Sequence, residues 1–119
     1  LKIKKRNNKI KIDSINNILR RISNPRAIKG HYDSNIIPGM KCYVGTNFAR
    51  IMANGDVAPC CRAVNNITGN LNKQSFSKIW NGNLQKQFRK EGLRMNKEFT
   101  EKIGCYKTCD NWWDNIEQK

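Results

Sequence analysis

Residues 54–61 read NGDVAPCC, and this stretch decides how the chain folds around its cysteines. Asn54-Gly55 predicts the tight turn of a β-hairpin, because both central residues of a type I′ turn need positive φ. Strand-forming residues precede the turn in residues 46–53 and follow it in residues 56–60. The sequence therefore predicts a small hairpin whose second strand runs into the pair of cysteines.

The two cysteines after the hairpin are adjacent, and adjacent side chains on a strand point to opposite faces. Cys60 and Cys61 are therefore not expected to serve the same site. Pro59 cannot donate a hydrogen bond to the sheet, so we expect the strand to weaken or end there. One cysteine is expected to act as a ligand and the other to pack beside it.

The cysteine content points to a metal or redox site. An odd number of cysteines argues against a complete set of disulfides. The basic N-terminus lacks the apolar stretch of a signal peptide, so we predict a cytoplasmic, reducing environment. Clustered cysteines in such a compartment more often bind metal or do redox chemistry. The five positions are Cys42, Cys60, Cys61, Cys105 and Cys109.

Four of these cysteines can converge on one site. Cys42 and Cys60 bracket the hairpin, so their sulfurs can approach each other at the strand ends. Cys105 and Cys109 lie four residues apart and share one face if their segment is helical. Four such thiolates suit tetrahedral zinc or an iron–sulfur cluster, and the spacing alone leaves both open. Cys61 replaces Cys60 as a ligand if the register shifts by one residue.

Length and composition limit the chain to one small domain with a modest core. The chain has 119 residues, 38% of them hydrophobic, and a domain of this kind is often stabilised by a metal or a cross-link. The formal net charge of +14 is typical of nucleic-acid binding, but it also follows from a composition rich in lysine and asparagine. No apolar run reaches the roughly 18–20 residues of a membrane helix. The leading Leu1 suggests a piece of a longer protein.

A helix is expected before the cysteine-containing region. An apolar stripe with helical spacing runs through residues 14–22, with Asp13 or Ser14 as its cap. This stripe needs a partner against which to be buried. The stripe consists of Ile15, Ile18, Leu19 and Ile22.

We divide the chain into a basic N-terminal segment, residues 1–41, and a cysteine-containing domain, residues 42–119.

Short helices are also expected in the second half of the chain. Ser75 caps a helix that carries Trp80, and Gly82 separates it from a second helical stretch that ends near Gly92. We expect Trp80 to pack in the core rather than to bind a ligand. A last helix is expected from Thr108 onward. The side chains available to pack it are Trp112, Trp113 and Ile116.

The cysteines belong to a longer pattern. The first cysteine is followed by a gap and by Gly-x4-Cys, then by a Gly-Asn turn, a short helix, an arginine-bearing helix and a closing pair of cysteines. This pattern resembles the SPASM/twitch domain that follows the catalytic barrel of many radical S-adenosylmethionine (radical SAM) enzymes. The resemblance covers about three-fifths of the chain. The matching stretches are Cys42, Gly55-Asp56-Val57-Ala58-Pro59-Cys60, Gly69-Asn70-Leu71, Ser75-Phe76-Ser77-Lys78-Ile79-Trp80-Asn81, Phe88-Arg89, and Cys105 with Cys109.

The resemblance implies an α+β fold with one metal cluster. A small β-hairpin is followed by short helices around the cluster and is preceded by a helix and a loop. The closing pair is C-x3-C here, where C-x2-C is common, and the longer cysteine series of full SPASM domains is missing. The family likeness therefore implies one auxiliary [4Fe–4S] cluster in a twitch-like half of the fold. Its implied ligands are Cys42, Cys60, Cys105 and Cys109, with Cys61 as the alternative to Cys60.

The same resemblance implies a role and a partner. A cluster held by four thiolates has no open iron position, so its implied role is electron transfer to or from the active site of the barrel. The sequence lacks the C-x3-C-x2-C loop that binds the S-adenosylmethionine cluster, so the chain is not expected to be catalytic by itself. Its implied partner is the radical SAM barrel of the same parent chain.

A second class of function uses the charge instead of the cluster. A zinc-stapled basic module that binds RNA or DNA would use the net charge of +14 and the three tryptophans. We rank it second, because the sequence carries no recognised nucleic-acid-binding motif. The basic surface would equally favour an acidic peptide substrate or an acidic electron donor, and no membrane partner is expected. His31, the single histidine, lies in a predicted loop and is not expected to bind the metal.

Overall fold

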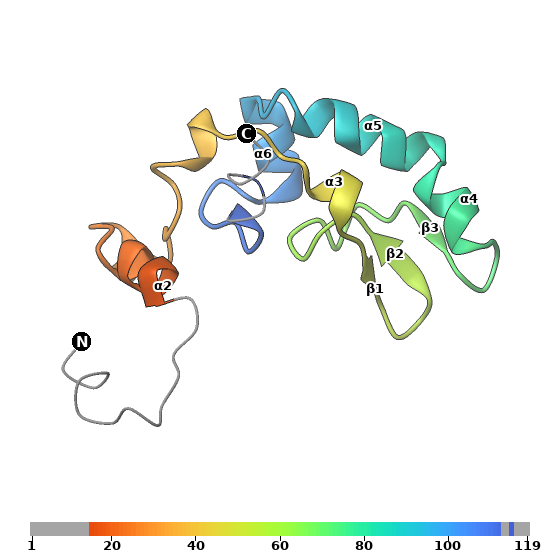
Figure 1. Ribbon diagram of the computed structural model, residues 1–119, viewed down its shortest axis with the longest axis horizontal. Coiled ribbons are helices and arrows are strands. Elements are labelled where there is room, and N and C mark those ends of the chain that lie inside the picture. Colours follow the sequence, from red (N-terminus) through yellow and green to blue (C-terminus); the bar gives the residue numbers. More distant parts are fainter. Residues whose placement is uncertain (1–14, 113–114, 116–119) are drawn as a thin grey trace.

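Three short antiparallel strands and several short helices form a small α+β fold. The α+β class and the hairpin were predicted, whereas the third strand lies at Gly69–Asn70, where a turn was expected. The structure, a computed structural model, describes residues 15–112 and Asn115. The strands are β1 (Arg50–Ile51), β2 (Asp56–Ala58) and β3 (Gly69–Asn70), and β2 lies between the other two (Figure 1). Each strand is only two or three residues long, so the sheet cannot be stable without the helices that cover it.

The central strand β2 is the most buried part of the sheet. Val57 pairs with Ile51 of β1 on one side and with Gly69 of β3 on the other. Val57 and Ala58 are buried, whereas both residues of β1 are exposed. The strand ends directly before Pro59, as the sequence predicts, and the chain continues into the pair of cysteines.

The hairpin turn differs from the predicted type I′ turn. The N–H of Gly55 donates to the carbonyl of Met52 (2.9 Å), and Gly55 has a φ of 85°, but Asn54 has no positive φ. This is a three-residue loop that ends in a left-handed glycine. Asn54 serves through its side chain instead, because its oxygen accepts the N–H of Asp56 (3.1 Å) and its amide nitrogen donates to the Asp56 carboxylate (2.7 Å).

Of the strand expected over residues 46–53, only Arg50–Ile51 forms β1, and the first two residues belong instead to a helical turn, α3 (Val44–Asn47). The carbonyl of Gly45 in this turn accepts from the side chains of Gln85 (3.0 Å) and Arg89 (2.7 Å). These two donors come from a helix about forty residues later in the chain. Tertiary contacts of this kind overrode the local strand propensity.

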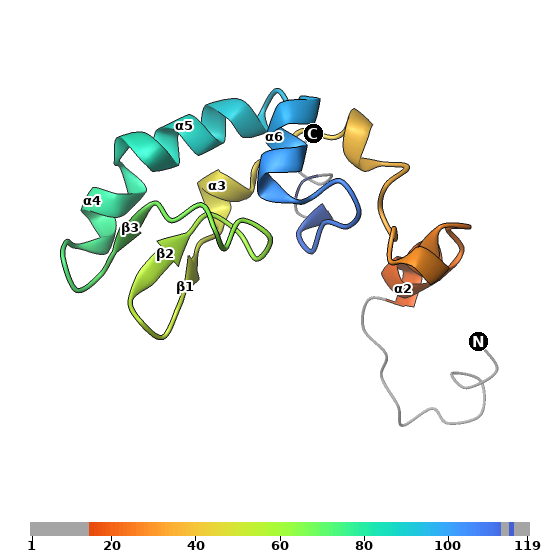
Figure 2. The ribbon, with the colours of Figure 1, turned by 180° about the vertical axis from the view of Figure 1, so that it is seen from behind.

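Two of the helices follow the predicted boundaries. Ser75 caps α4 (Phe76–Trp80), and its hydroxyl accepts the N–H of Lys78 (3.4 Å). Gly82 then breaks the helix, as expected, and acts as the N-cap of α5 (Asn83–Gly92). Figure 2 shows α5 continuing from α4 beside the sheet and leading toward the cysteine-bearing end of the domain.

A third helix, α6 (Lys97–Ile103), lies outside the sequence-based expectations. The side chain of Asn96 caps its start by accepting the N–H of Phe99 (2.8 Å). Gly104 ends it in the left-handed conformation, with a φ of 73°. Asparagine before and glycine after an apolar stripe are ordinary helix boundary signals, so the sequence did contain the information.

One apolar core joins α3, α5, α6 and the loops that carry the cysteines. The rings of Phe88 and Phe99 pack at 5.3 Å between centroids. Trp80 is only partly buried and stacks on the exposed Phe76, so it packs at the edge of the domain, and its neighbour Ile79 is the fully buried residue of α4. The core residues are Ile37, Met40, Val44, Cys60, Ala63, Phe88, Met95, Phe99, Ile103, Cys105 and Trp112.

The N-terminal part of the described chain is α2 (Ile15–Ile22), which confirms the predicted helix. Two short 3₁₀ helices follow it, at Ala27–Lys29 and Ile37–Gly39. The helix lies at the opposite end of the molecule from the sheet (Figure 1). Its apolar stripe is largely unburied, since Ile18 is 50% and Ile22 is 62% exposed.

Some expectations fall on residues outside the described part of the chain. These are the cap at Asp13 or Ser14 and the packing of Trp113 and Ile116. Within residues 15–112 and at Asn115, no helix has the length and hydropathy needed to cross a membrane.

Candidate metal centre

Four cysteines line one cavity, although they come from three separate segments of the sequence. Cys42 lies just before α3, and Cys60 follows β2. Cys105 and Cys109 belong to the loop after α6. The rest of the lining is mostly apolar. It comprises Ile37, Met40, Val44, Arg62, Phe88, Met95, Phe99, Ile103, Asp110, Asn111 and Asn115.

The end of α5 fixes the position of Cys42. The N–H of Cys42 donates to the carbonyl of Gly92 (3.0 Å). Gly92 lies so close that a Cβ added to it would be 2.9 Å from the carbonyl oxygen of Cys42 and 3.3 Å from the Cys42 Cβ. Only glycine therefore fits at this end of the helix without moving the cysteine.

Backbone groups surround the Cys60 sulfur. This side chain is 8% exposed, and its Sγ accepts the N–H of Ala63 (3.3 Å). The turn after Cys60 folds back on itself, and Arg62 within it donates to the carbonyl of Gly104 (2.8 Å). The hairpin strand is thereby tied to the loop that carries the other two cysteines.

Cys105 and Cys109 do not share a helical face, contrary to the expectation for this pair. Gly104 ends α6 in the left-handed conformation, so the chain enters a non-helical loop before the first of the two cysteines. The N–H of Cys105 still reaches back to the carbonyl of Thr100 (3.0 Å). A loop and not a helical turn brings both sulfurs to the cavity.

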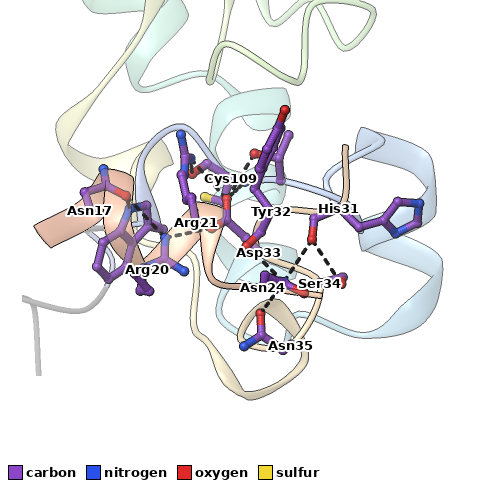
Figure 3. Close-up of polar contacts among 12 residues, drawn as sticks. Asn17, Arg20, Arg21, Asn24, His31, Tyr32, Asp33, Ser34, Asn35 and Cys109 are labelled. Atoms are coloured by element: carbon purple, nitrogen blue, oxygen red, sulfur yellow. Dashed lines mark hydrogen bonds and ion pairs between the residues drawn. The ribbon is translucent and has the colours of Figure 1, made fainter. Parts of the chain in front are cut away.

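A buried carboxylate holds the Cys109 end of this loop (Figure 3). Asp33 is completely buried, and its carboxylate accepts the N–H of Cys109 (2.9 Å) and the hydroxyl of Thr108 (3.0 Å). Arg20 and Arg21 of α2 donate to the same carboxylate at 2.7 and 3.0 Å. The Arg21 guanidinium also donates to the carbonyl of Cys109 (2.7 Å).

Asn115 reaches the cysteines from the C-terminal side. Its amide nitrogen lies 3.7 Å from the Sγ of Cys109, within hydrogen-bond range of a sulfur acceptor. Its amide oxygen accepts the N–H of Tyr43 (2.7 Å), the residue after Cys42. One buried amide therefore connects two of the four cysteine positions.

The electrostatics of the cavity disfavour four bare thiolates. Burial raises the pKa of Cys42 and of Cys105 to about 11 and that of Cys109 to about 12. Burial also raises the pKa of Cys60. As thiolates, Cys42, Cys105 and Cys109 would each also be repelled by two of the other sulfurs in the cavity. A positively charged group among them removes this penalty, so the chemistry of the donor set fits the irons of a cluster.

The remaining sequence candidates lie outside the cavity lining. Cys61 is half-buried beside Cys60 but does not line the cavity. His31 contributes its backbone carbonyl, which accepts from Asn24 (2.9 Å), and its ring is not part of the lining.

All five cysteines are free thiols. Within the described residues, no three His, Cys, Asp or Glu side chains are grouped closely enough to bind a single metal ion.

Sequence reasoning missed three residues that shape this site. Asp33, Gly92 and Asn115 each contact a cysteine of the cavity. Asp33 offered one signal, because an acidic residue that is one of only two in the basic segment 1–41 is a candidate for a buried ion pair. Gly92 and Asn115 offered none, since their roles depend on contacts with residues far away in the sequence.

One comparison with known proteins gives a match. The family model of SPASM, described as an iron–sulfur cluster-binding domain, matches residues 42–111. The matched region contains all four cysteines of the cavity. No curated protein and no solved structure matches the chain. Because the family model covers more than half of the sequence, the chain belongs to the SPASM family of iron–sulfur cluster-binding domains.

Proposed function

We propose that the chain is the auxiliary domain of a radical SAM enzyme and binds one [4Fe–4S] cluster through Cys42, Cys60, Cys105 and Cys109. The observation that carries the proposal is the convergence of these four cysteines on one largely apolar cavity. The family match supports iron–sulfur binding, and four thiol ligands are what a [4Fe–4S] cluster requires.

The surroundings of the sulfurs support a redox role. When bound, a [4Fe–4S] cluster supplies one-electron transfer at a potential set by burial and by hydrogen bonds to its sulfurs. The chain provides burial, since Cys60 and Cys105 are each only 8% exposed. It also provides hydrogen bonds to sulfur, since the N–H of Ala63 donates to Cys60 and the amide of Asn115 lies within reach of Cys109. With all four positions taken by thiolates, the domain serves to pass electrons and not to bind substrate at iron. The reducing cytoplasm suits a protein whose five cysteines are all free.

The partner that we propose is the radical SAM barrel of the same parent chain. The sequence has no C-x3-C-x2-C loop, so the chemistry on S-adenosylmethionine belongs to that barrel. The net charge of +14 supports docking of an acidic peptide substrate or an acidic electron donor. These partners follow from the family likeness and the charge.

The metal content of the purified chain tests the proposal. Anaerobic purification or reconstitution is expected to give a brown protein with about four irons and four sulfides per chain. Iron, sulfide and zinc analysis with an absorption spectrum makes the measurement. A colourless protein that holds one zinc would reject the cluster, and RNA binding that weakens steeply with salt would then favour the basic module.

Asn115→Leu is expected to lower the reduction potential of the cluster. The amide hydrogen bond to the Cys109 sulfur favours the reduced, more negative cluster, and leucine has a similar size but no donor. A hydrogen bond of about 0.5–1.5 kcal/mol corresponds to roughly 20–60 mV for one electron. Potentiometric titration followed by electron paramagnetic resonance (EPR) measures it. Asn65→Leu, at an exposed loop position, is the matched control, and an equal potential in both variants would contradict this role of Asn115.

A further inference from the structure

The N-terminal segment contacts the Cys109 loop through an ionic cluster centred on the buried Asp33. The matched region begins at residue 42, and Asp33 lies before it. Its carboxylate is completely buried and has four donors, namely Arg20, Arg21, Thr108 and the backbone N–H of Cys109. A buried carboxylate with this many donors stays charged and fixes the groups around it.

Two residues of this ionic cluster bond to the backbone of Cys109, one at its N–H and the other at its carbonyl (Figure 3). Asp33 accepts the N–H of this cysteine at 2.9 Å, and Arg21 donates to its carbonyl at 2.7 Å. The backbone N–H of Asp33 donates in turn to the carbonyl of Lys107 (3.0 Å). Both peptide groups of Cys109 are therefore held by an ion pair, in a loop that no regular secondary structure supports.

We propose that Asp33 and Arg21 are positioning residues that hold Cys109 in its ligating conformation, so that residues of the N-terminal segment form part of the cluster site. This inference rests on the proposed function for the identity of the bound group. Polar groups that orient a metal ligand usually change metal affinity or activity by about 10- to 100-fold when they are replaced.

The structure supplies a matched control on the same helix. Arg20 pairs with the same carboxylate at 2.7 Å but makes no hydrogen bond to the cysteine loop. Instead, its guanidinium lies 3.7 Å from the centre of the Trp112 ring. Arg20→Gln thus removes one ion pair of the buried cluster and leaves the two contacts to Cys109 in place. Arg21→Gln removes the guanidinium contact with the Cys109 carbonyl. Asp33→Asn removes the negative charge and one of the two acceptor oxygens, so the single amide oxygen cannot accept from all four donors, the Cys109 N–H among them.

The test compares metal release from these three variants in the full chain. Each protein is loaded anaerobically, and a chelator then removes the metal that the wild-type chain takes up, with the release rate followed by absorbance. Asp33→Asn and Arg21→Gln are expected to release metal at least about tenfold faster than wild type, and Arg20→Gln less than about threefold faster. Circular dichroism on the same samples identifies variants that have unfolded.

A second readout separates positioning from general destabilisation. Asp33→Asn removes a negative charge beside Cys109 and is expected to raise the reduction potential of the cluster, whereas Arg21→Gln removes a positive charge and is expected to lower it. Loss of folding alone does not give shifts of opposite sign. The EPR spectrum of the reduced protein is also expected to change in both variants, because a ligand sulfur has moved.

Several outcomes would overturn the inference. One is wild-type release rates and spectra in folded Asp33→Asn and Arg21→Gln proteins. Another is equally fast release from Arg20→Gln, which would show that the ion pairs only stabilise the fold. A wild-type chain that binds zinc in place of a cluster refutes the proposed function, but the release rates then still test the two residues. A chain that takes up no metal refutes both.

Discussion

Cys60→Ser is expected to lose most of its iron, whereas Cys61→Ser is expected to keep a full cluster. The Cys60 sulfur lines the cavity and already accepts the N–H of Ala63, so it is placed as a ligand. Cys61, the next residue, does not line the cavity. Serine is nearly the same size as cysteine, so the two variants differ mainly in which sulfur is removed.

Iron and sulfide analysis after anaerobic reconstitution measures this difference. We expect Cys61→Ser to retain about four irons per chain and Cys60→Ser to retain a small fraction of that number. Loss of iron from Cys61→Ser with retention in Cys60→Ser would show that the register of the ligands is shifted by one residue. The adjacent cysteines thus act as an internal control for each other.

Gly92→Ala is the second change with a large expected effect, although it leaves all five cysteines intact. Alanine in a helix is normally more favourable than glycine by about 1 kcal/mol. At this position, however, the added Cβ would be 2.9 Å from the Cys42 carbonyl oxygen and 3.7 Å from the Cys42 sulfur. Because the carbonyl belongs to the backbone, the cysteine must move, and we expect both a less stable fold and a large loss of iron.

Overpacking of this kind typically costs about 1–3 kcal/mol, which exceeds the gain in helix propensity. Urea unfolding of the chain and its iron content after reconstitution make the two measurements. Gly39→Ala is the matched control, because a Cβ at this exposed glycine has no atom within 4 Å. A Gly92→Ala protein as stable and as rich in iron as the Gly39→Ala protein would show that Cys42 tolerates the shift.

The parts of the fold that local chemistry determines were predictable from sequence. The helix capped by Ser75, the break at Gly82 and the end of the strand before Pro59 each depend on one residue with a strong conformational preference. The family pattern of the cysteines was equally readable and agrees with the SPASM match. Their assignment as ligands stays a prediction, which the serine variants test.

The parts that depend on distant contacts were not predictable in this way. Residues 46–53 have strand propensity, but the first two belong to the helical turn α3, whose Gly45 carbonyl accepts hydrogen bonds from Gln85 and Arg89. The turn at Asn54 was assigned the wrong type, because the asparagine contributes its side chain and not a positive φ. The burial of Asp33 likewise requires two arginines and a loop more than seventy residues later.

The contacts of Asp33 and Arg21 with the backbone of Cys109 also affect the order in which the chain folds. The contacts of Asp33 and Arg21 with this residue span 76 and 88 positions in the sequence. Closing a loop of this length has an entropic cost, and contacts of high sequence separation slow folding. We therefore expect a newly made chain to gather three sulfurs through the hairpin and α6 first, and to place the fourth only when Arg21 and Asp33 meet the loop that carries Cys109.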